Sequence, residues 1–324
     1  MAVVLDTARP GVARRPAPTP VLIGLGAASA LLVLVLVLAT AQRGPGGRIL
    51  TTRPVPESHP SLWGFDHWIA LVQIATVIAT SLFLAWFGVW SRRHGRLHPA
   101  LPVLAALFVM GLLTDSFANW TSSAAMNPEL LHYPTNWWFF SVSPTVEPLI
   151  NTVAYPYLFL GPALAVVRLL GRHLLRHPRW TAFVVTYVVA LPINLVLVNL
   201  FMVRIEYWTY TQIPGWAAVR GGTAWQYPWT DTLTLSVLTA VTAVLLCRDA
   251  DSPRRSMARE VVVGIVLSAL AYLPYNAVWA SFRLTDSGDS LAKPWPYVNT
   301  KVYDPKGDYA RAGVPGPYFR GMWP

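Results

Sequence analysis

The stretch LPVLAALFVMGLLTDSFANW, residues 101–120, decides how this chain is interpreted. It is apolar for most of its length, and a helix needs roughly 20 such residues to cross about 30 Å of hydrocarbon. Near its end stand Asp115 and Asn119, one helical turn apart. An aspartate inside a membrane helix costs up to about 3.5 kcal/mol, so it turns toward the interior of a bundle or a wet cavity. The stretch therefore predicts a membrane span that carries a polar site.

Six further stretches of the 324-residue chain are also long and apolar enough to cross a membrane. The composition agrees, because 54% of the residues are hydrophobic and only 12% are charged. The additional spans are predicted at 21–40, 68–90, 148–171, 180–202, 231–247 and 259–282. We expect an all-α membrane protein, a bundle of seven transmembrane helices with aromatic-rich outer loops and an irregular C-terminal tail.

Two local features qualify this bundle. Arg14 and Arg15 precede the first span and residues 39–41 follow it, a pattern that a cleaved signal peptide also has, although the apolar core is longer than usual for one. Prolines inside the other spans free backbone carbonyls and are predicted to kink their helices. They are Pro156, Pro162, Pro192 and Pro274.

Arginine predicts the orientation of the bundle. Segments 1–20, 91–99, 168–179 and 248–259 are rich in arginine, whereas 120–145 has no Lys or Arg. By the positive-inside rule, the chain is a multi-pass protein of the cell membrane with a cytoplasmic N-terminus and an outer C-terminus. The domains expected are a disordered tail at 1–20, a transmembrane domain at 21–282, and a Pro/Gly-rich tail at 283–324 that packs over the outer end.

The carboxylates near the spans share one end of the predicted bundle, because consecutive spans alternate in direction. These acids are Asp66, Asp115, Glu147, Glu206 and Asp231. Polar residues at the same end are Asn119, Asn136, Asn151, Asn199, Tyr272, Tyr275 and Asn276. Twelve of the 15 tryptophans lie there as well, Trp120, Trp138 and Trp208 among them. Aromatic belts normally mark both interfaces, so a one-sided set predicts an aromatic-lined cavity roofed by 120–145, 203–229 and the tail.

Asp115 is the acid with the weakest structural explanation, since it ends a span, where the helix dipole disfavours an anion. Asp115 and Asn119 share a helix face, and Glu147 and Asn151 repeat the spacing on the next span. Neighbouring antiparallel helices are usually in contact, so the two pairs are predicted to face one pocket.

The other acids have structural interpretations too. Glu147 and Asp231 can cap the helices that follow them, and capping is the favoured interpretation of Asp231. Glu206 can pair with Arg204 or Arg220 at the interface, and Asp66 is expected to be solvated or capping.

Several function classes lack their signatures in the sequence. It has no nucleotide-binding glycine loop, no HExxH and no GxSxG. Its three lysines lie in the tail, which excludes a retinal Schiff base in the last span, and Cys247 alone allows no internal disulfide. The net charge of +10 is explained by arginines between spans, so we expect no nucleic-acid partner and no metal site.

Several stretches taken in order resemble the AveC-like spirocyclase family, integral membrane proteins of actinobacteria. The resemblance covers about residues 60 to 320. The stretches are DSFAN at 115–119, SPTVEP at 143–148 with Ala154-Tyr155 beyond it, EYWTY at 206–210, IPG at 213–215, QYP at 226–228, YVNTKVY at 297–303 and GVPGP at 313–317. Two features depart from the family pattern: the tail has no cysteines, and the acid after Gln-Tyr-Pro is shifted to Asp231.

The resemblance implies an enzyme that forms spiroketals in polyketides, and some members also dehydrate the product. A spiroketal cyclase needs a general acid, a second carboxylate and an apolar cavity, but no cofactor. We predict Asp115, Glu147 and Glu206 as catalytic residues acting on a lipophilic dihydroxy-ketone. Residues predicted to contact the substrate are Asn119, Asn151, Tyr155, Tyr210, Asp231, Tyr272, Tyr275, Asn276, Trp120, Trp138 and Trp208.

Two alternatives remain open from the sequence. A membrane terpene cyclase would use the same acids and aromatics on a prenyl chain. A non-catalytic lipid- or metabolite-binding protein or transporter needs access from both sides, yet the inner halves of the spans hold almost no polar residues.

Overall fold

A computed structural model gives the fold of the chain. The residues that it describes are 62–95, 97–127, 130, 148–170, 178–247, 257–285, 287–292, 302–303, 308–311 and 318–319.

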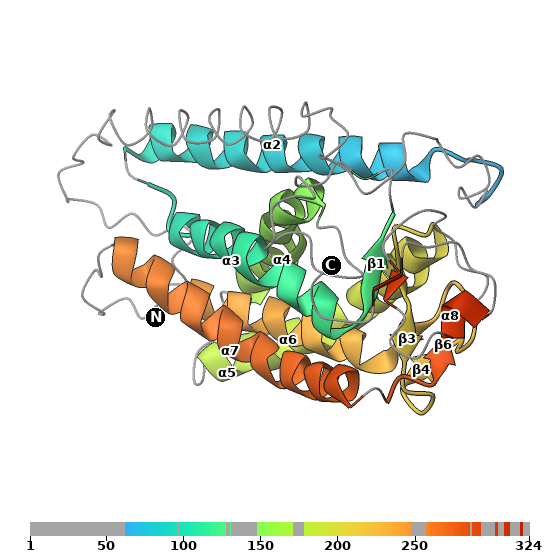
Figure 1. Ribbon diagram of the computed structural model, residues 1–324. Coiled ribbons are helices and arrows are strands. Elements are labelled where there is room, and N and C mark those ends of the chain that lie inside the picture. Colours follow the sequence, from blue (N-terminus) through green and yellow to red (C-terminus); the bar gives the residue numbers. More distant parts are fainter. Residues whose placement is uncertain are drawn as a thin grey trace.

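Six helices in the described part of the chain are long and apolar enough to cross a membrane (Figure 1). They are α2 (Trp68–His94), α3 (Leu101–Thr121), α4 (Leu149–Leu170), α5 (Pro178–Ile193) with its continuation η2 (Asn194–Met202), α6 (Trp229–Leu246) and α7 (Met257–Leu284). Six of the seven predicted spans are thus confirmed as helices within a few residues. The span at 21–40 lies outside the described residues, so the count of seven and the orientation stay predictions.

Helix α3 is the most buried of the six. It packs against α4 on one side and α7 on the other, and α6 packs against α4, α5 and α7. Gly264 of α7 allows close approach to α3, because a Cβ at Gly264 would lie 2.7 Å from the Cβ of Ala106. Helix α2 lies along the edge of the group (Figure 1) and packs on α4, where the Thr76 and Tyr157 hydroxyls are 3.1 Å apart.

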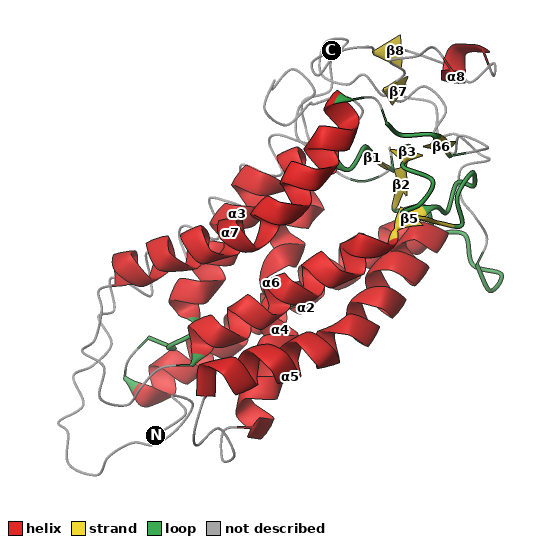
Figure 2. Cartoon of the chain, turned by 90° about the horizontal axis from the view of Figure 1, so that it is seen from below, coloured by secondary structure: helices red, strands yellow, loops and turns green. Residues whose placement is uncertain are grey.

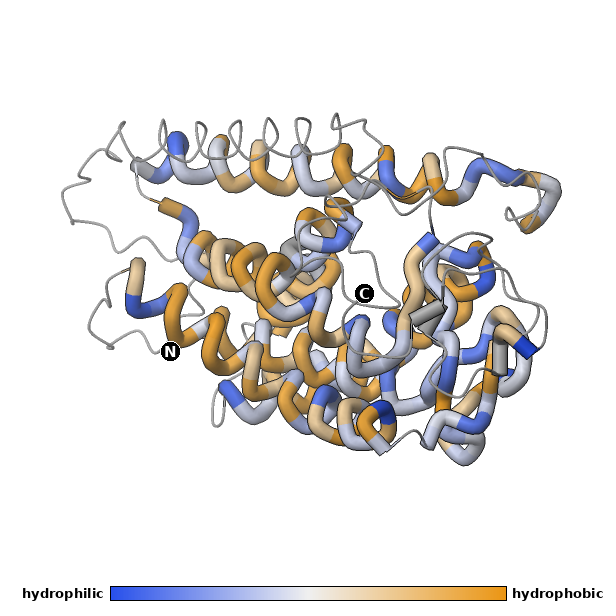
Figure 3. Tube along the Cα trace, in the orientation of Figure 1, coloured by the Kyte–Doolittle hydropathy of each residue, from blue (hydrophilic) through white to orange (hydrophobic). Residues whose placement is uncertain are grey.

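The two ends of the bundle differ in character. Helix α2 ends with the basic residues Arg92, Arg93 and His94, of which the two arginine cations suit the negative end of the helix dipole. Gly95 closes the helix in the left-handed conformation at φ 60°. The opposite end carries the short strands, and Figure 2 shows β1, β2, β3, β5 and β6 gathered there. Apolar residues dominate the helices between the two ends (Figure 3).

The loops at the strand end are more regular than the sequence predicts. They form two-stranded antiparallel ladders, β1 with β2, β3 with β6, and β4 with β5. The strands are β1 (Ala124–Met126), β2 (Trp208–Tyr210), β3 (Gln212–Ile213), β4 (Ala218–Val219), β5 (Tyr227–Pro228) and β6 (Ser290–Leu291). In the tail lie β7 (Val302–Tyr303), the short helix α8 (Asp308–Arg311) and β8 (Tyr318–Phe319), with β7 and β8 parallel.

Gln226 ties these ladders together. Its fully buried amide donates from Nε2 to the carbonyl of Tyr210 at 2.8 Å and to that of Ser290 at 3.1 Å. Its Oε1 accepts from the Ser290 hydroxyl at 2.8 Å and from the N–H of Gly222 at 3.0 Å. One side chain therefore links β2 to β6, which are about 80 residues apart in the chain.

The fifth span changes helix type partway along. It is α-helical to Ile193 and then π-helical over Asn194–Met202. The sequence predicts a kink at Pro192; the structure places a change of hydrogen-bonding pattern just after this proline. Such π segments inside α-helices are rare and recur at functional sites.

Candidate active site

Asp115 lies in the interior, on the face of α3 that meets α4. It is 4% exposed, and its Oδ2 accepts from the Asn119 amide at 3.2 Å and from the Asn151 amide of α4 at 2.8 Å. Its Oδ1 accepts from the hydroxyl of Tyr155. We call Asp115, Asn119, Asn151 and Tyr155 the Asp115 cluster. The predicted meeting of polar faces from α3 and α4 is present, but Glu147 lies outside the described residues.

Gly111 makes this cluster possible. It precedes Asp115 by one turn on the same face of α3. A Cβ at Gly111 would lie 3.1 Å from Cγ and 3.3 Å from Cβ of Tyr155. Because glycine leaves this space open, the tyrosine ring lies flush against α3 and its hydroxyl reaches the carboxylate one turn further on.

A second buried carboxylate, Asp231, lies in the first turn of α6 and is 7% exposed. The hydroxyls of Tyr210 from β2 and Tyr275 from α7 hydrogen-bond to it. The Asn199 amide of η2 lies 2.7 Å from its Oδ2 when oriented to donate. We call Asp231, Asn199, Tyr210 and Tyr275 the Asp231 cluster. Its place in the first turn suits the helix dipole, as the capping interpretation requires, but capping does not account for these bonds to other elements.

Tyr272 of α7 lies between the two clusters. Its hydroxyl oxygen is 3.5 Å from that of Tyr155, and its ring meets that of Tyr275 edge to face at a centroid distance of 6.4 Å. The carboxyl groups of Asp115 and Asp231 are both close enough to its hydroxyl to interact with it. The two carboxylates therefore share one tyrosine-rich interior.

Tyr210 lies outside the helices, in β2. Burial raises the pKa of Tyr210 well above its ordinary value of 10.0, and the negative charge of Asp231 raises it further. Its hydroxyl therefore keeps its proton and donates to the carboxylate.

Glu206 forms a separate group just beyond η2. Its carboxyl accepts from the Trp225 indole N–H at 3.3 Å, and the guanidinium of Arg204 stacks over the Trp225 ring at 4.0 Å. Burial raises the pKa of Glu206 from 4.5 to about 7, and the indole and Arg204 lower it by less. The next residue connects this group to the Asp115 cluster, because the Tyr207 hydroxyl donates to Asn151 Oδ1 at 3.0 Å.

Three other predicted residues lie apart from the carboxylates. Asn276 accepts from the Thr121 hydroxyl at 3.0 Å and joins α7 to α3. Trp120 lies under the buried guanidinium of Arg283, 4.8 Å from the ring centroid, and its carbonyl accepts from Arg283 Nη1 at 2.6 Å. Half-buried Trp208 packs edge to face on Tyr207 and Tyr210. Trp138 lies outside the described residues.

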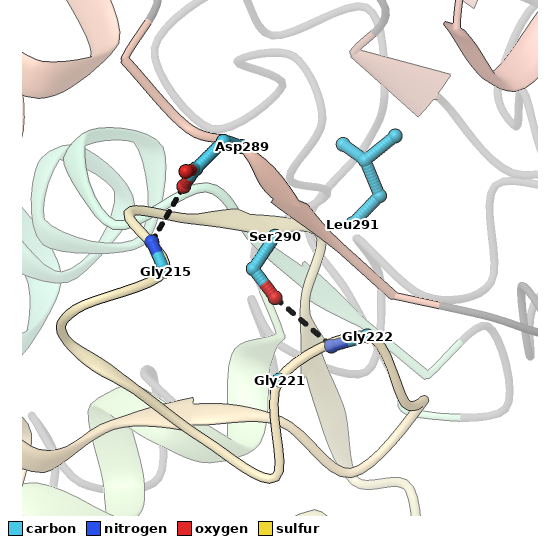
Figure 4. A pocket seen from close by; sticks show the side chains of 6 residues that line it. All are labelled: Gly215, Gly221, Gly222, Asp289, Ser290 and Leu291. Atoms are coloured by element: carbon cyan, nitrogen blue, oxygen red, sulfur yellow. Dashed lines mark hydrogen bonds between the residues drawn. The ribbon is translucent and has the colours of Figure 1, made fainter.

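Two pockets in the described part of the chain are lined by neither Asp115 nor Asp231. The larger, about 350 Å³, is an open surface hollow between β6 and the 215–222 loop (Figure 4). There Asp289 binds the N–H of Gly215 and the Ser290 hydroxyl accepts from that of Gly222, so its polar groups hold the loop. The predicted chamber was to be roofed in part by 120–145, of which 128–129 and 131–145 lie outside the described residues, and it stays a prediction.

The described residues contain no group of three or more His, Cys, Asp or Glu side chains that could hold a metal ion. What they bring together instead is two carboxylates surrounded by hydroxyl and amide donors. Such an arrangement is suited to moving protons.

Residues 91–303 match the family model described as Spirocyclase AveC-like. The chain belongs to the AveC-like spirocyclase family. This match covers about two thirds of the chain and includes both carboxylate clusters and Glu206. No curated protein and no solved structure matches the chain. Membership in the AveC-like family suggests an enzyme with a spirocyclase-type function, and the apolar helices are compatible with it.

The sequence analysis does not predict Asn199 as a site residue and lists it only among the polar residues at one end of the bundle. The reason is that a π-helix turns Asn199 toward α6, and the sequence does not predict a π-helix. Arg283 is missed as well, since the sequence places it just past the end of the last span.

Proposed function

We propose that this AveC-like protein is a membrane-embedded spiroketal cyclase that acts by acid/base catalysis on a lipophilic dihydroxy-ketone polyketide. The observation that carries the proposal is the pair of buried carboxylates on different helices, each bound by a tyrosine hydroxyl and an amide. The family match supports the reaction type.

The reaction consists of proton transfers around one carbon. A hydroxyl of the substrate adds to its ketone and gives a hemiketal. An acid then protonates the hemiketal hydroxyl, water leaves, and an oxocarbenium ion forms. The second hydroxyl attacks this carbon and loses its proton to a base, so the net change is one ketone and two hydroxyls to one spiroketal and one water.

Asp115 and Asp231 are proposed to carry these protons. Glycosidases also use two carboxyls for an oxocarbenium-like transition state, one giving a proton while the other accepts one or stabilises the cation. In this chain the tyrosines that donate to the carboxylates supply further exchangeable protons. Aromatic rings at the same end favour a cationic intermediate.

Two other carboxyls stay candidates for the same work. Glu147 precedes α4, the helix that packs next to Asp115 on α3, and the sequence predicts that the two acids face one pocket. Glu206 has a pKa of about 7, so at neutral pH it exists in both protonation states and meets the requirement for a general acid. The partners proposed are the bilayer and a lipophilic substrate, with no cofactor taking part in the steps above.

The test uses the full chain in lipid nanodiscs with a lipophilic ketone that carries a δ-hydroxyl on each side. Because such ketones also close slowly by acid alone, the rate and the stereochemistry of the product are followed at neutral pH against empty nanodiscs. A faster rate with one spiroketal stereoisomer supports the proposal. A rate and isomer ratio equal to those of empty nanodiscs contradicts it.

Parallel incubations distinguish the alternatives. Consumption of an epoxyprenyl chain with no action on the dihydroxy-ketone would favour a terpene cyclase. Flux of the ketone across sealed liposomes without conversion would favour a transporter. Chromatography of the products from the dihydroxy-ketone also reveals a dehydrated spiroketal if a second loss of water follows.

A further inference from the structure

The π-helix η2 carries two buried asparagines, Asn194 and Asn199, which are five residues apart and at most 3% exposed. Both face α6. The amide of Asn194 donates to the Ser236 hydroxyl at 3.1 Å, and the amide of Asn199 bonds to the Thr232 hydroxyl. Thr232 and Ser236 are four residues apart on α6 and share one of its faces.

The helix type explains how both asparagines meet one face. In an α-helix of 3.6 residues per turn, side chains five residues apart diverge by about 140°. In a π-helix the hydrogen bonds run from i to i+5, so residues five apart return to nearly the same side. An α-helical register from Asn194 onward would turn Asn199 away from α6.

Asn199 reaches one group that Asn194 does not, the carboxylate of Asp231. With Nδ2 toward Asp231, the amide donates to Oδ2 at 2.7 Å while its Oδ1 accepts from the Thr232 N–H at 3.2 Å and from the Thr232 hydroxyl. The reverse orientation would set Oδ1 against a carboxylate oxygen and Nδ2 against an N–H. Amide orientation follows from the hydrogen-bond network, so the donating orientation holds.

We propose that Asn199 is a positioning residue, brought to Asp231 by the π-helical register, that fixes the orientation of this carboxylate and holds it as a proton acceptor. The groups that face Asp231 from the other elements are the hydroxyls of Tyr210 and Tyr275, with the charge-coupled Tyr272 beyond them. The tyrosine hydroxyls can also accept a hydrogen bond from a protonated carboxyl, whereas an amide N–H only donates one. Asn199 is therefore the partner that favours an ionised Asp231 in every protonation state of its neighbours.

The experiment compares Asn199→Ala with Asn194→Ala, a matched control that loses the same type of side chain from the same helix face. Dicyclohexylcarbodiimide modifies protonated carboxyl groups inside membranes, and mass spectrometry of peptides reports the extent of modification of Asp231. A carboxylate that loses an amide donor is protonated more readily. We expect about tenfold faster modification in Asn199→Ala than in wild type, the size of one charge-assisted hydrogen bond, and no change in Asn194→Ala.

Equal modification of Asp231 in the two variants, including none in either, overturns the proposal. So does faster modification in both, which would indicate general loosening of η2. A second variant, Asn199→Gln, keeps the amide on a longer side chain and is expected to recover part of the wild-type protection.

The role of Asn199 in turnover rests on the proposed function, and the two can fail separately. With the dihydroxy-ketone, Asn199→Ala is expected to lower kcat about tenfold with KM unchanged, and Asn194→Ala to leave both unchanged. Carbodiimide modification needs no substrate, so it tests the effect of Asn199 on Asp231 even when wild type shows no cyclase activity. A wild-type kcat in Asn199→Ala would remove the residue from the mechanism.

Discussion

The Asp115 and Asp231 clusters use the same types of side chain but assemble them in different ways. Asp115 receives its amides and its tyrosine from regular α-helices, one of them its own, at helical spacing. Asp231 receives its amide from a π-helix, one tyrosine from a short strand and another from α7. The first cluster follows from local periodicity, whereas the second depends on irregular backbone and on pairing between distant segments.

The largest expected effect tests whether the two clusters are equivalent. We expect Asp115→Asn and Asp231→Asn each to slow spiroketal formation by about 100-fold or more, the usual contribution of a general acid or base. The double variant should be little slower than either single variant, because residues that act as a unit are not additive. The rate with the dihydroxy-ketone at neutral pH measures this.

Asp66→Asn serves as the control, since Asp66 is exposed and lies just before α2. Tryptophan fluorescence and size-exclusion elution show whether each variant is folded. A wild-type rate in Asp231→Asn together with a slow rate in Asp115→Asn would mean that the Asp231 cluster has a structural role. Glu147 would then be the candidate for the second catalytic carboxyl.

A smaller effect tests the packing that builds the first cluster. Gly111→Ala places a Cβ 3.1 Å from Cγ of Tyr155, so the ring must shift by a few tenths of an ångström, which strains its hydrogen bond to Asp115. We expect a loss of about 1–3 kcal/mol in stability and a clear fall in kcat. Gly161→Ala on α4 is the matched control, because its Cβ would meet nothing within 4 Å. Equal melting temperatures for the two variants would show that Tyr155 adapts.

Tyr272→Phe tests whether the clusters communicate. It keeps the ring and removes the hydroxyl 3.5 Å from that of Tyr155. The loss of one neutral hydrogen bond predicts about a twofold to tenfold decrease in kcat. Tyr187→Phe on α5 makes the same change outside both clusters and should leave the rate unchanged. No decrease in Tyr272→Phe would mean that the two carboxylates work independently.

The last prediction concerns pH and Glu206, a buried carboxyl that accepts from the Trp225 indole N–H. The pKa of Glu206 is raised from 4.5 to about 7 in the folded protein. The stability that its neutral carboxyl contributes to the folded protein is therefore fully present below pH 4.5 and is lost as pH rises to about 7. Glu206→Gln should escape this loss. The gain in unfolding free energy of the variant over wild type should grow across that window, to at most on the order of 3 kcal/mol before solvent screening.

Melting temperatures of both proteins at a series of pH values measure the difference. A gap that is constant with pH would mean that Glu206 is ionised in the folded protein throughout the window.

The sequence predicts the Asp115 cluster well for a physical reason. Apolar runs define the spans, i and i+4 positions share a face, and adjacent spans are antiparallel, so Asp115, Asn119 and Asn151 converge. None of these rules applies to Asp231, which also has an adequate local explanation as a first-turn acid. Its partners Tyr210 and Asn199 depend on the β1–β2 pairing and on a π-helix, and neither leaves a periodic signal in the residues.

The aromatic residues give a mixed outcome. Tyr155, Tyr210 and Tyr275 lie in the two clusters and Tyr272 lies between them, as expected from their place at one end of the bundle. Trp120 and Asn276 lie at the same end but bind Arg283 and Thr121 instead. Sharing an end of a bundle is therefore weaker information than sharing a helix face.

The bonds of Gln226 have a consequence for biogenesis. They join the segment that holds Tyr210 to Ser290, which the ribosome makes after the last span. Tyr275 also belongs to that late part of the chain. The Asp115 cluster can form once the first half of the described bundle is inserted, whereas the Asp231 cluster must wait until synthesis is nearly finished, so a half-made chain cannot hold a complete pair of acids.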